Sequence, residues 1–435
     1  MRKILLLALA LGCGAALAAE PASRMGVDAP QLAPLGDQAV GVKTLHLVQH
    51  EQVDVLAFDA AKGSAPSVDR VLTVELWYPA RPNPSMPRAV YSASLPSEPP
   101  APPAQFSIPG IAVRDAQPVG RHHPLVIVSH GYSNDPNAMT WLTENLASKG
   151  YVVAAIHHDD PPITDRSRFA EPLMRRPLDI AFVAQALQGT LAADQLVDPA
   201  RTALVGYSMG GYGVLTAAGA TLDPDGSVKW VPGGLMLPFA RGGALCDSIK
   251  VKGLRAVVAI SPAGGGALAS WGGEGLRAIT VPVLLIAGDQ DRTVDYVTGA
   301  RAIFDMSKRA HRYLLTFKGG GHASGLGPVP DAMRQRLWDR DWFEDPVWRK
   351  DRIVAINAHF ITAFLDRYVK GDESRSAYLD VAVADSSAGV WPAATPPLAY
   401  DAYSPGAAGV TVWKGFQRNH AAGLELLQAQ ARSTP

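Results

Sequence analysis

Short runs of continuous apolar residues recur along the chain and are separated by longer stretches of mixed character. Such runs are typical of strands that are covered on both faces of a sheet. The pattern predicts strands at 125–129, 151–156, 202–206, 256–260, 281–287 and 312–317. Because helical patterns alternate with these strands, we expect an α/β fold with a mostly parallel, doubly wound sheet and helices on both faces.

Apolar residues spaced by three or four positions predict helices between these strands. Such helices are expected at 136–150, 177–193 and 351–368. The first has Asp135 in place to cap it, Pro136 at its first position and Gly150 at its end. Arg176 and Asp179 would lie at the start of the second helix, where we expect a cap and a surface or interdomain ion pair.

Two segments near the N-terminus, 42–48 and 71–78, are rich in β-branched residues and alternate in polarity. They predict antiparallel partner strands at one edge of the sheet. Residues 82–103 are rich in proline, which cannot donate to a strand ladder, so they predict a surface excursion or linker. Near the C-terminus, residues 424–429 predict a short amphipathic helix.

Residues 1–18 predict a secretory signal peptide, because Arg2 and Lys3 precede an apolar run that ends in small residues. An exported protein, periplasmic or secreted, is therefore expected. Cys13 also resembles the cysteine of a bacterial lipoprotein box, so a lipid anchor is an alternative. Residues 19–41 are rich in Pro, Ala and Gly and predict an extended segment over the surface.

The composition narrows the range of partners. Lys and Arg number 40, as do Asp and Glu, so the formal net charge is zero and no basic footprint for nucleic acid or an anionic membrane is present. No later apolar run reaches the length of a membrane span. The chain has two cysteines, and removal of the signal would leave only Cys246, so no intramolecular disulfide is expected.

The segment 202–213, TALVGYSMGGYG, places a serine directly between a strand pattern and a helix pattern. Gly206-Tyr207-Ser208-Met209-Gly210 has the G-x-S-x-G form of a nucleophile elbow, in which the serine lies on a sharp strand-to-helix turn. Glycines are needed beside it because the backbone approaches its neighbours closely there. Ser208 is therefore the candidate nucleophile.

A serine hydroxyl needs a base and a group that orients that base. Asp291 follows the strand at 281–287, and His322 follows the strand at 312–317 after three glycines. The order Ser, Asp, His is that of the α/β-hydrolases. We favour Asp291 over Asp289 as the acid, because a residue further along the loop can turn toward the histidine.

The tetrahedral intermediate also needs two hydrogen-bond donors for its oxyanion. The backbone N–H of Met209, the residue after the nucleophile, supplies one of them. Tyr132, in the loop after the strand at 125–129, supplies the second, and the Gly131 N–H is the rival donor.

These motifs resemble those of a known group of serine hydrolases. HPLVIVSHGYSN, GYSMGG, LIAGDQDRTV and GGGHAS look like the predicted dienelactone hydrolases, which are related to platelet-activating-factor acetylhydrolases and cutinase-like polyester hydrolases. The resemblance covers roughly residues 40–370. It implies Ser208, Asp291 and His322 as the triad and Tyr132 and Met209 as the oxyanion donors, without a cofactor. True dienelactone hydrolases use a cysteine nucleophile, and the serine here argues against that activity.

Other polar and aromatic residues could also contribute to a site. His157-His158-Asp159-Asp160 is not expected to bind a metal, because neighbouring residues on an extended chain point to opposite faces. His158 could still contact a substrate. Tryptophans could line an apolar acyl pocket or belong to the core; they are Trp271, Trp338, Trp342 and Trp348.

The sequence therefore predicts one catalytic α/β-hydrolase domain at 42–370, with possible lid segments at 221–252 and 323–350, and a C-terminal extension at 371–435. We expect a serine hydrolase that cleaves carboxylic esters, small or lipid-like, through an acyl-enzyme. Cleavage of amides or polyesters by the same triad is one alternative. A non-catalytic binding protein on a hydrolase scaffold is another.

Overall fold

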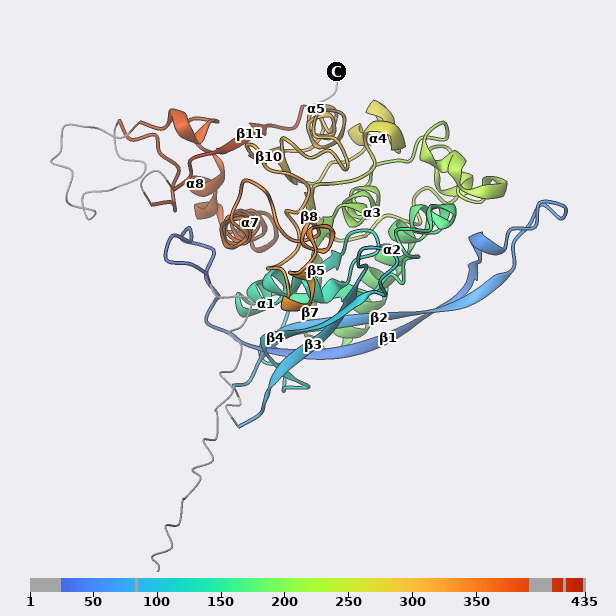
Figure 1. Ribbon diagram of the computed structural model, residues 1–435, viewed down its shortest axis with the longest axis horizontal. Coiled ribbons are helices and arrows are strands. Elements are labelled where there is room, and N and C mark those ends of the chain that lie inside the picture. The colour runs from blue at the N-terminus through green and yellow to red at the C-terminus, as the bar shows by residue number, and fades with distance from the viewer. Residues whose placement is uncertain (1–24, 83–84, 391–408, 418–419, 433–435) are drawn as a thin grey trace, which may run out of the picture.

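The computed structural model describes residues 25–82, 85–390, 409–417 and 420–432. Within these ranges eleven strands form one sheet, in the order β11-β10-β9-β8-β7-β5-β6-β2-β1-β4-β3 (Figure 1). The expected signal peptide and Cys13 lie outside the described residues. No helix in the described part of the chain is both long and apolar enough to cross a bilayer.

The six central strands, β10 to β6 in the sheet order, are mutually parallel, and β11 and β2 flank them in antiparallel orientation. The strands are β1 Ala39–Val53, β2 Ser67–Ala80, β3 Arg88–Leu95, β4 Ala104–Arg114, β5 His123–Ser129, β6 Val152–Ile156, β7 Val197–Tyr207, β8 Leu254–Ile260, β9 Val283–Gly288, β10 Arg312–Phe317 and β11 Leu424–Ala429. The expected mostly parallel α/β-hydrolase sheet is confirmed.

Helices connect these strands. The α-helices are α1 Thr140–Ser148, α2 Ala170–Ala193, α3 Met209–Ala217, α4 Gly272–Arg277, α5 Ala302–Met306, α6 Leu337–Arg340, α7 Lys350–Leu365 and α8 Ser376–Leu379. Short 3₁₀ or π segments are η1 Val55–Ala57, η2 Pro136–Met139, η3 Arg166–Arg168, η4 Ser227–Trp230, η5 Pro232–Gly234, η6 Leu237–Phe239, η7 Gly266–Leu268, η8 Val297–Arg301, η9 Asp331–Met333, η10 Asp366–Lys370, η11 Glu373–Arg375 and η12 Ser386–Ala388.

Alternate residues of the central strands point to opposite faces of the sheet, and each face has its own core. Val126 and Val128 of β5 pack with α1 and α7 on one face, whereas Leu125 and Ile127 pack with α2 and α3 on the other. Figure 1 shows these helix pairs on the two sides of the strands. All four side chains are fully buried, which explains why β5 is apolar without alternation.

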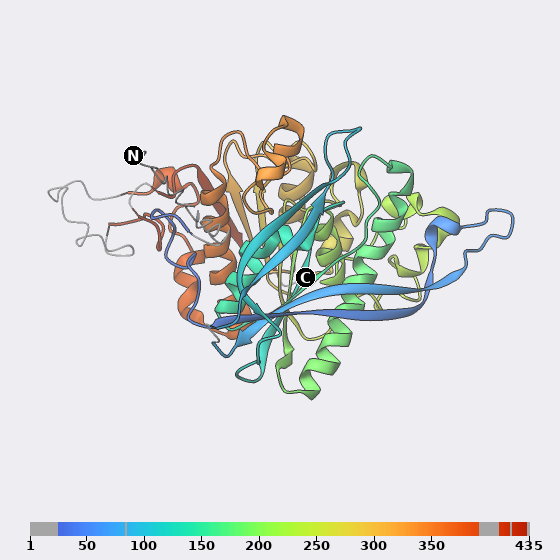
Figure 2. The same ribbon diagram turned by 60° about the horizontal axis from the view of Figure 1, so that its bottom comes forward.

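The N-terminal strands differ in part from the prediction. β1 and β2 are antiparallel partners, as expected, and the ends that carry residues 49–67 project beyond the rest of the sheet (Figure 2). They do not form the edge, however, because β4 pairs with β1 and β3 pairs with β4. The predicted linker at 82–103 is therefore wrong over β3, where Val90 to Leu95 contain no proline and alternate in burial.

The predicted helix at 424–429 is also wrong, because this segment is strand β11, antiparallel to β10. Leu424 and Leu426 are buried while the residues between and beyond them are more exposed, a period of two that fits a strand. The expected C-terminal extension thus contributes a strand to the sheet.

Helix α2 begins at Ala170, seven residues before the predicted start, and Pro177 lies inside it. Proline is common at the first position of a helix, but Pro177 is an internal residue of α2. Arg176 and Asp179 are consequently in the body of the helix and fully buried, so the predicted helix cap and surface ion pair are wrong.

Candidate active site

The turn between β7 and α3 holds Ser208 in an unusual backbone conformation. Its φ of 53° and ψ of −115° lie outside the regions that most residues adopt, and its side chain opens to a cavity. A Cβ on Gly206 would lie 2.2 Å from the Gly210 carbonyl oxygen. One on Gly210 would lie 2.0 Å from the Ser129 carbonyl oxygen. Both contacts involve backbone, so this turn requires glycine at these two positions.

The loops after β9 and β10 bring the predicted acid and base to this turn. His322 Nε2 lies 3.0 Å from Ser208 Oγ, and His322 Nδ1 lies 2.7 Å from a carboxylate oxygen of Asp291. Ser208 is 9% exposed, and the Asp291 side chain is almost completely buried. The structure therefore joins the three residues in one hydrogen-bonded chain that ends at a serine hydroxyl.

The environment of Asp291 favours its charged form. Burial alone would raise the pKa of this carboxyl, but the His322 hydrogen bond and charge, with the Val294 and Thr293 amides, lower it overall. The rival, Asp289, instead accepts a 2.7 Å hydrogen bond from the Gly319 amide. Asp291 is therefore the carboxylate that contacts His322.

Tyr132 and Met209, the predicted oxyanion donors, lie at the same cavity. Both residues line the cavity that contains Ser208 and His322. Neither amide donates a hydrogen bond to another group of the described chain. Met209 is the first residue of α3, and the first amides of a helix have no intrahelical acceptor. Two unpaired donors thus lie beside the serine, although the Gly131 amide remains the rival to Tyr132.

The cavity above Ser208 has a volume of about 440 Å³ and a largely apolar lining. Trp338 and Trp342 form part of the wall and contact each other edge to face, with ring centroids 5.6 Å apart. Both lie in the expected lid segment 323–350. Other apolar lining residues are Ile163, Phe169, Ala263, Leu268 and Val294.

An aromatic series leads from this cavity into a neighbouring one of about 510 Å³. Tyr132 meets Phe169 edge to face at 5.5 Å, and Phe169 lies 6.3 Å from Trp230. Trp230 belongs to the expected lid segment 221–252 and is 51% exposed. The two cavities share Tyr132, Phe169, Ile163 and Leu268, so they form one continuous apolar surface.

The two predicted substrate contacts, Trp271 and His158, do not line the cavity above Ser208. Trp271 is 1% exposed, stacks on Tyr212 and donates to Thr216 Oγ1, so it belongs to the core between α3 and α4. His158 has a completely buried side chain and is absent from the lining of this cavity. Trp348 packs against Phe317 and is also a core residue.

His158 instead takes part in a buried polar network under the loop that follows β5. Its Nδ1 lies 2.9 Å from Asp179 and its Nε2 lies 2.9 Å from Ser129 Oγ. Ser129, His158 and Asp179 are thus connected in the same way as Ser208, His322 and Asp291. All three side chains are buried, however, and Arg176 also donates to Ser129 Oγ. Burial, reinforced by the charges of Arg176 and Arg70, lowers the pKa of His158 well below its usual value.

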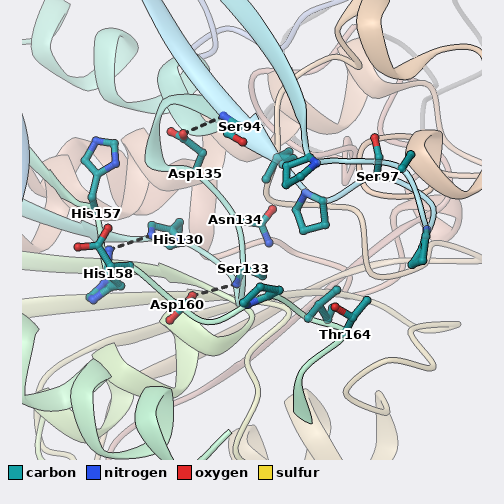
Figure 3. A pocket seen from close by; sticks show the side chains of 18 of the residues that line it. Ser94, Ser97, His130, Ser133, Asn134, Asp135, His157, His158, Asp160 and Thr164 are labelled. Carbon is teal, nitrogen blue, oxygen red and sulfur yellow. Dashed lines mark hydrogen bonds between the residues drawn. The ribbon is translucent and has the colours of Figure 1, made fainter. Parts of the chain in front are cut away.

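A third, more polar cavity of about 570 Å³ lies on the other side of this loop (Figure 3). Prolines of the segment between β3 and β4 form one wall, and the segment 157–164 forms another. Asn134 and Ile163 line both this cavity and the one above Ser208. No group of three or more His, Cys, Asp or Glu side chains within the described ranges could hold a metal ion.

Four residues in or behind the site were not predicted as such from the sequence: Phe169, Leu268, Ile163 and Arg176. The first three come from irregular segments whose apolar residues have no diagnostic spacing. The burial of Arg176 follows from the true start of α2, which the spacing of Phe169 and Leu173 before Pro177 could have indicated.

The segment that contains Tyr132 and Ser208 is similar to a known protein family. Residues 116–230 match a family model described as PET hydrolase-like (PETase). Over 107 residues, 25% of this chain, the sequence is 30% identical to Cutinase est2 of Thermobifida alba and to Cutinase 2 of Thermobifida cellulosilytica, covering 34% and 38% of those proteins. The chain spans about a third of the length of the curated relatives it matches. The similarity to cutinases therefore covers about a quarter of this chain.

Among solved structures, a ferulic acid esterase from Streptomyces cinnamoneus aligns over 77% of this chain and 91% of its own, with 22% identity and a TM-score of 0.46.

Proposed function

We propose that this protein is a serine hydrolase that cleaves carboxylic esters through an acyl-enzyme. The observation that carries the proposal is the chain of hydrogen bonds from Asp291 through His322 to Ser208, which ends in an apolar cavity. The match of residues 116–230 to the PET hydrolase-like family model and the similarity to cutinases over 107 residues support the same reaction class.

In the first half of the reaction, His322 Nε2 takes the Ser208 hydroxyl proton while Oγ attacks the ester carbonyl carbon. The carbonyl oxygen becomes an oxyanion and accepts hydrogen bonds from the Met209 and Tyr132 amides. The intermediate collapses as the carbon–oxygen bond of the ester breaks. His322 passes its proton to the leaving alcohol, and the acyl group stays on Ser208.

In the second half, water attacks the acyl-enzyme while His322 takes one of its protons. Collapse of the second intermediate breaks the bond to Oγ, returns that proton to Ser208 and releases the carboxylic acid. Asp291 stays ionised and holds His322 with Nδ1 protonated, so that Nε2 faces the serine. The cycle needs no metal or cofactor.

The apolar wall of Trp338, Trp342, Phe169 and Leu268 suits an acyl group that is aromatic or aliphatic. Because this wall continues to the exposed Trp230, a polyester chain is a candidate substrate alongside small esters. Amide cleavage by the same triad is the alternative within enzymes. A ligand-binding role without turnover is the alternative outside them.

We propose that the catalytic domain contains residues 42–370 together with β11, which belongs to its sheet, and that 221–252 and 323–350 shape the cavity. We also propose that residues 1–18 direct the protein out of the cytoplasm, to the periplasm or the medium, with lipidation of Cys13 as the alternative to cleavage after residue 18.

The proposal is tested with p-nitrophenyl esters of increasing chain length, a matching anilide and a polyester film, for the wild type and Ser208→Ala. We expect ester hydrolysis that depends on Ser208 and is faster than anilide hydrolysis. Turnover of the anilide alone would favour an amidase. Absence of turnover on all substrates would favour a binding protein.

A further inference from the structure

The loop between β5 and η2 contains the candidate oxyanion donor Tyr132, and one buried side chain contacts this loop on the side away from the cavity. Arg176 of α2 is completely buried and uses all five of its N–H groups. Two of these groups donate to consecutive backbone carbonyls, those of His130 and Gly131, the latter at 3.0 Å. The others donate to Asp160 and Ser129.

These contacts fix the direction of the amides that follow. In a trans peptide the C=O and the N–H point in opposite directions. Because the Gly131 carbonyl points to Arg176, the Tyr132 N–H of the same peptide unit points away from it. The same reasoning applies to the His130 carbonyl and the Gly131 N–H. Arg176 therefore turns both candidate donors away from α2, whichever of them binds the oxyanion.

His130 also contacts the peptide unit between Gly131 and Tyr132. His130 Nε2 accepts from the His158 amide, so its proton is on Nδ1, which donates to the Gly131 carbonyl at 2.7 Å. Burial and the Arg176 charge lower the pKa of His130 well below its usual value, which keeps the ring neutral. The Gly131 carbonyl thus has two donors.

Asp160 connects Arg176 to the peptide unit that follows Tyr132. Its carboxylate receives two N–H groups of Arg176 and also accepts from the Ser133 amide at 2.9 Å, a contact drawn in Figure 3. Ser133 has a φ of 54°, a conformation that non-glycine residues adopt only when their surroundings hold them. The peptide units on both sides of Tyr132 are consequently attached to one buried ion pair.

The position of Arg176 depends on the nucleophile helix. A Cβ on Gly213 of α3 would lie 3.1 Å from Arg176 Cβ and 2.7 Å from Ile180 Cδ1. The absence of a side chain at Gly213 lets α2 approach α3 closely, so the helix that follows Ser208 also locates the guanidinium.

We propose that Arg176, with Asp160 as its partner, is a positioning residue that orients the oxyanion-binding amide of the loop after β5. This inference rests on the proposed hydrolase function. Arg176 touches no substrate and acts through the Gly131–Tyr132 peptide. Lysine could not replace it, because an ammonium group cannot reach both carbonyls and the carboxylate in a planar arrangement.

The test compares an ester with its thionoester analogue, in which sulfur replaces the carbonyl oxygen. Oxyanion donors stabilise a developing oxygen anion more than a larger sulfur anion, so the ratio of the two rates reports on the oxyanion site. We expect Arg176→Lys and Arg176→Met to lower ester kcat about 10- to 100-fold per active site. KM should change little, and the ester-to-thionoester ratio should fall. Active sites are counted by the endpoint of fluorophosphonate labelling.

Arg175→Lys is the matched control. Arg175 is the neighbouring buried arginine of α2, but it donates to the Val53 carbonyl of β1, and within the described residues no hydrogen bond joins it to the loop. We expect it to lower thermal stability without changing the rate ratio. Asp160→Asn keeps the shape of the side chain and removes its charge, so it should lower the ester-to-thionoester ratio as Arg176→Lys does. This variant keeps the test usable if the arginine variants fold poorly.

The outcomes separate the two proposals. An unchanged ratio in Arg176→Lys and Asp160→Asn, in an enzyme whose wild type hydrolyses esters through Ser208, would overturn the positioning role and leave the function intact. A fall of the ratio in Arg175→Lys as well would also overturn it. A wild type without Ser208-dependent hydrolysis would reject the proposed function itself.

Discussion

The carboxylate of Asp291 lies 2.7 Å from Nδ1 of His322, across the ends of two neighbouring parallel strands. The two residues are 31 positions apart in the sequence. The contact forms because β9 and β10 end at the same edge of the sheet, where Ser208 also lies. A parallel sheet thus brings together side chains from successive loops.

Replacement of Asp291 by asparagine tests the role of this contact. Asparagine keeps the shape but can present its amide to His322 and favour the wrong tautomer, so we expect kcat to fall about 10³- to 10⁴-fold. Steady-state hydrolysis of a p-nitrophenyl ester measures this fall.

Asp289→Asn is the control for that substitution. Asp289 belongs to the same loop, but its partner is the Gly319 amide. We expect kcat within about threefold of the wild type, since a neutral acceptor remains. A larger loss of kcat in Asp289→Asn than in Asp291→Asn would reverse the assignment of the acid.

The close backbone approach at the elbow predicts a specific effect on stability. Gly210→Ala would place a Cβ 2.0 Å from the Ser129 carbonyl oxygen, and backbone cannot move aside cheaply. We expect the free energy of unfolding to fall by about 3 kcal/mol or more, measured by urea denaturation. Gly189→Ala is the control, because nothing lies within 4 Å of its added Cβ in α2, and it should stabilise the protein by up to about 1 kcal/mol. Equal effects would contradict this account.

Much of the central fold could be predicted because its signals are local. The strand at 312–317 was predicted at its observed bounds, and Asp135 accepts from the Asn137 amide at the start of η2, as a capping residue should. The elbow, with Gly206 and Gly210, could be recognised because its chemistry dictates residue types at fixed spacing.

The errors occurred where tertiary contacts override local patterns. Prolines before and after β3 obscured this strand, although Arg88 to Leu95 contain no proline. The six residues of β11 are too few to distinguish a period of two from a helical period. Trp271 and Trp338 are equally apolar in sequence, but only the structure shows that the first is in the core and the second in the cavity wall.

This difference between the two tryptophans is itself testable. Trp338→Ala removes part of the cavity wall, so we expect KM for an aromatic or long-chain ester to rise about 3- to 10-fold, with a smaller change for an acetate ester. Trp271→Phe removes a buried hydrogen bond to Thr216 and should lower the melting temperature with KM unchanged. The opposite assignment of the two effects would contradict the cavity described above.

Lys350 predicts a dependence of stability on pH. Its ammonium group donates to the Ala323 carbonyl beside His322, and burial lowers its pKa to about 8, with Glu344 and Asp345 opposing the shift. An unfolded lysine has a pKa of about 10.4, so the unfolded chain binds more protons in this window. Because the folded state disfavours the charged lysine, Lys350 costs no stability above the unfolded pKa. That stability is lost as the pH falls through about 8.

The measurement is the free energy of unfolding of the wild type minus that of Lys350→Met, at several pH values. We expect this difference to rise by about 2 kcal/mol between about pH 7 and pH 10. A difference that stays flat, or falls with pH, would show that Lys350 is not buried as described.

The central claim is that Ser208 is the nucleophile of an ester hydrolase, and active-site labelling tests it most directly. The protein is treated with a fluorophosphonate, digested and analysed by mass spectrometry, with Ser208→Ala in parallel. We expect one adduct, on Ser208, with loss of ester hydrolysis in proportion to labelling and no adduct in the variant. An adduct on another residue, or ester hydrolysis that survives in Ser208→Ala, would contradict the account.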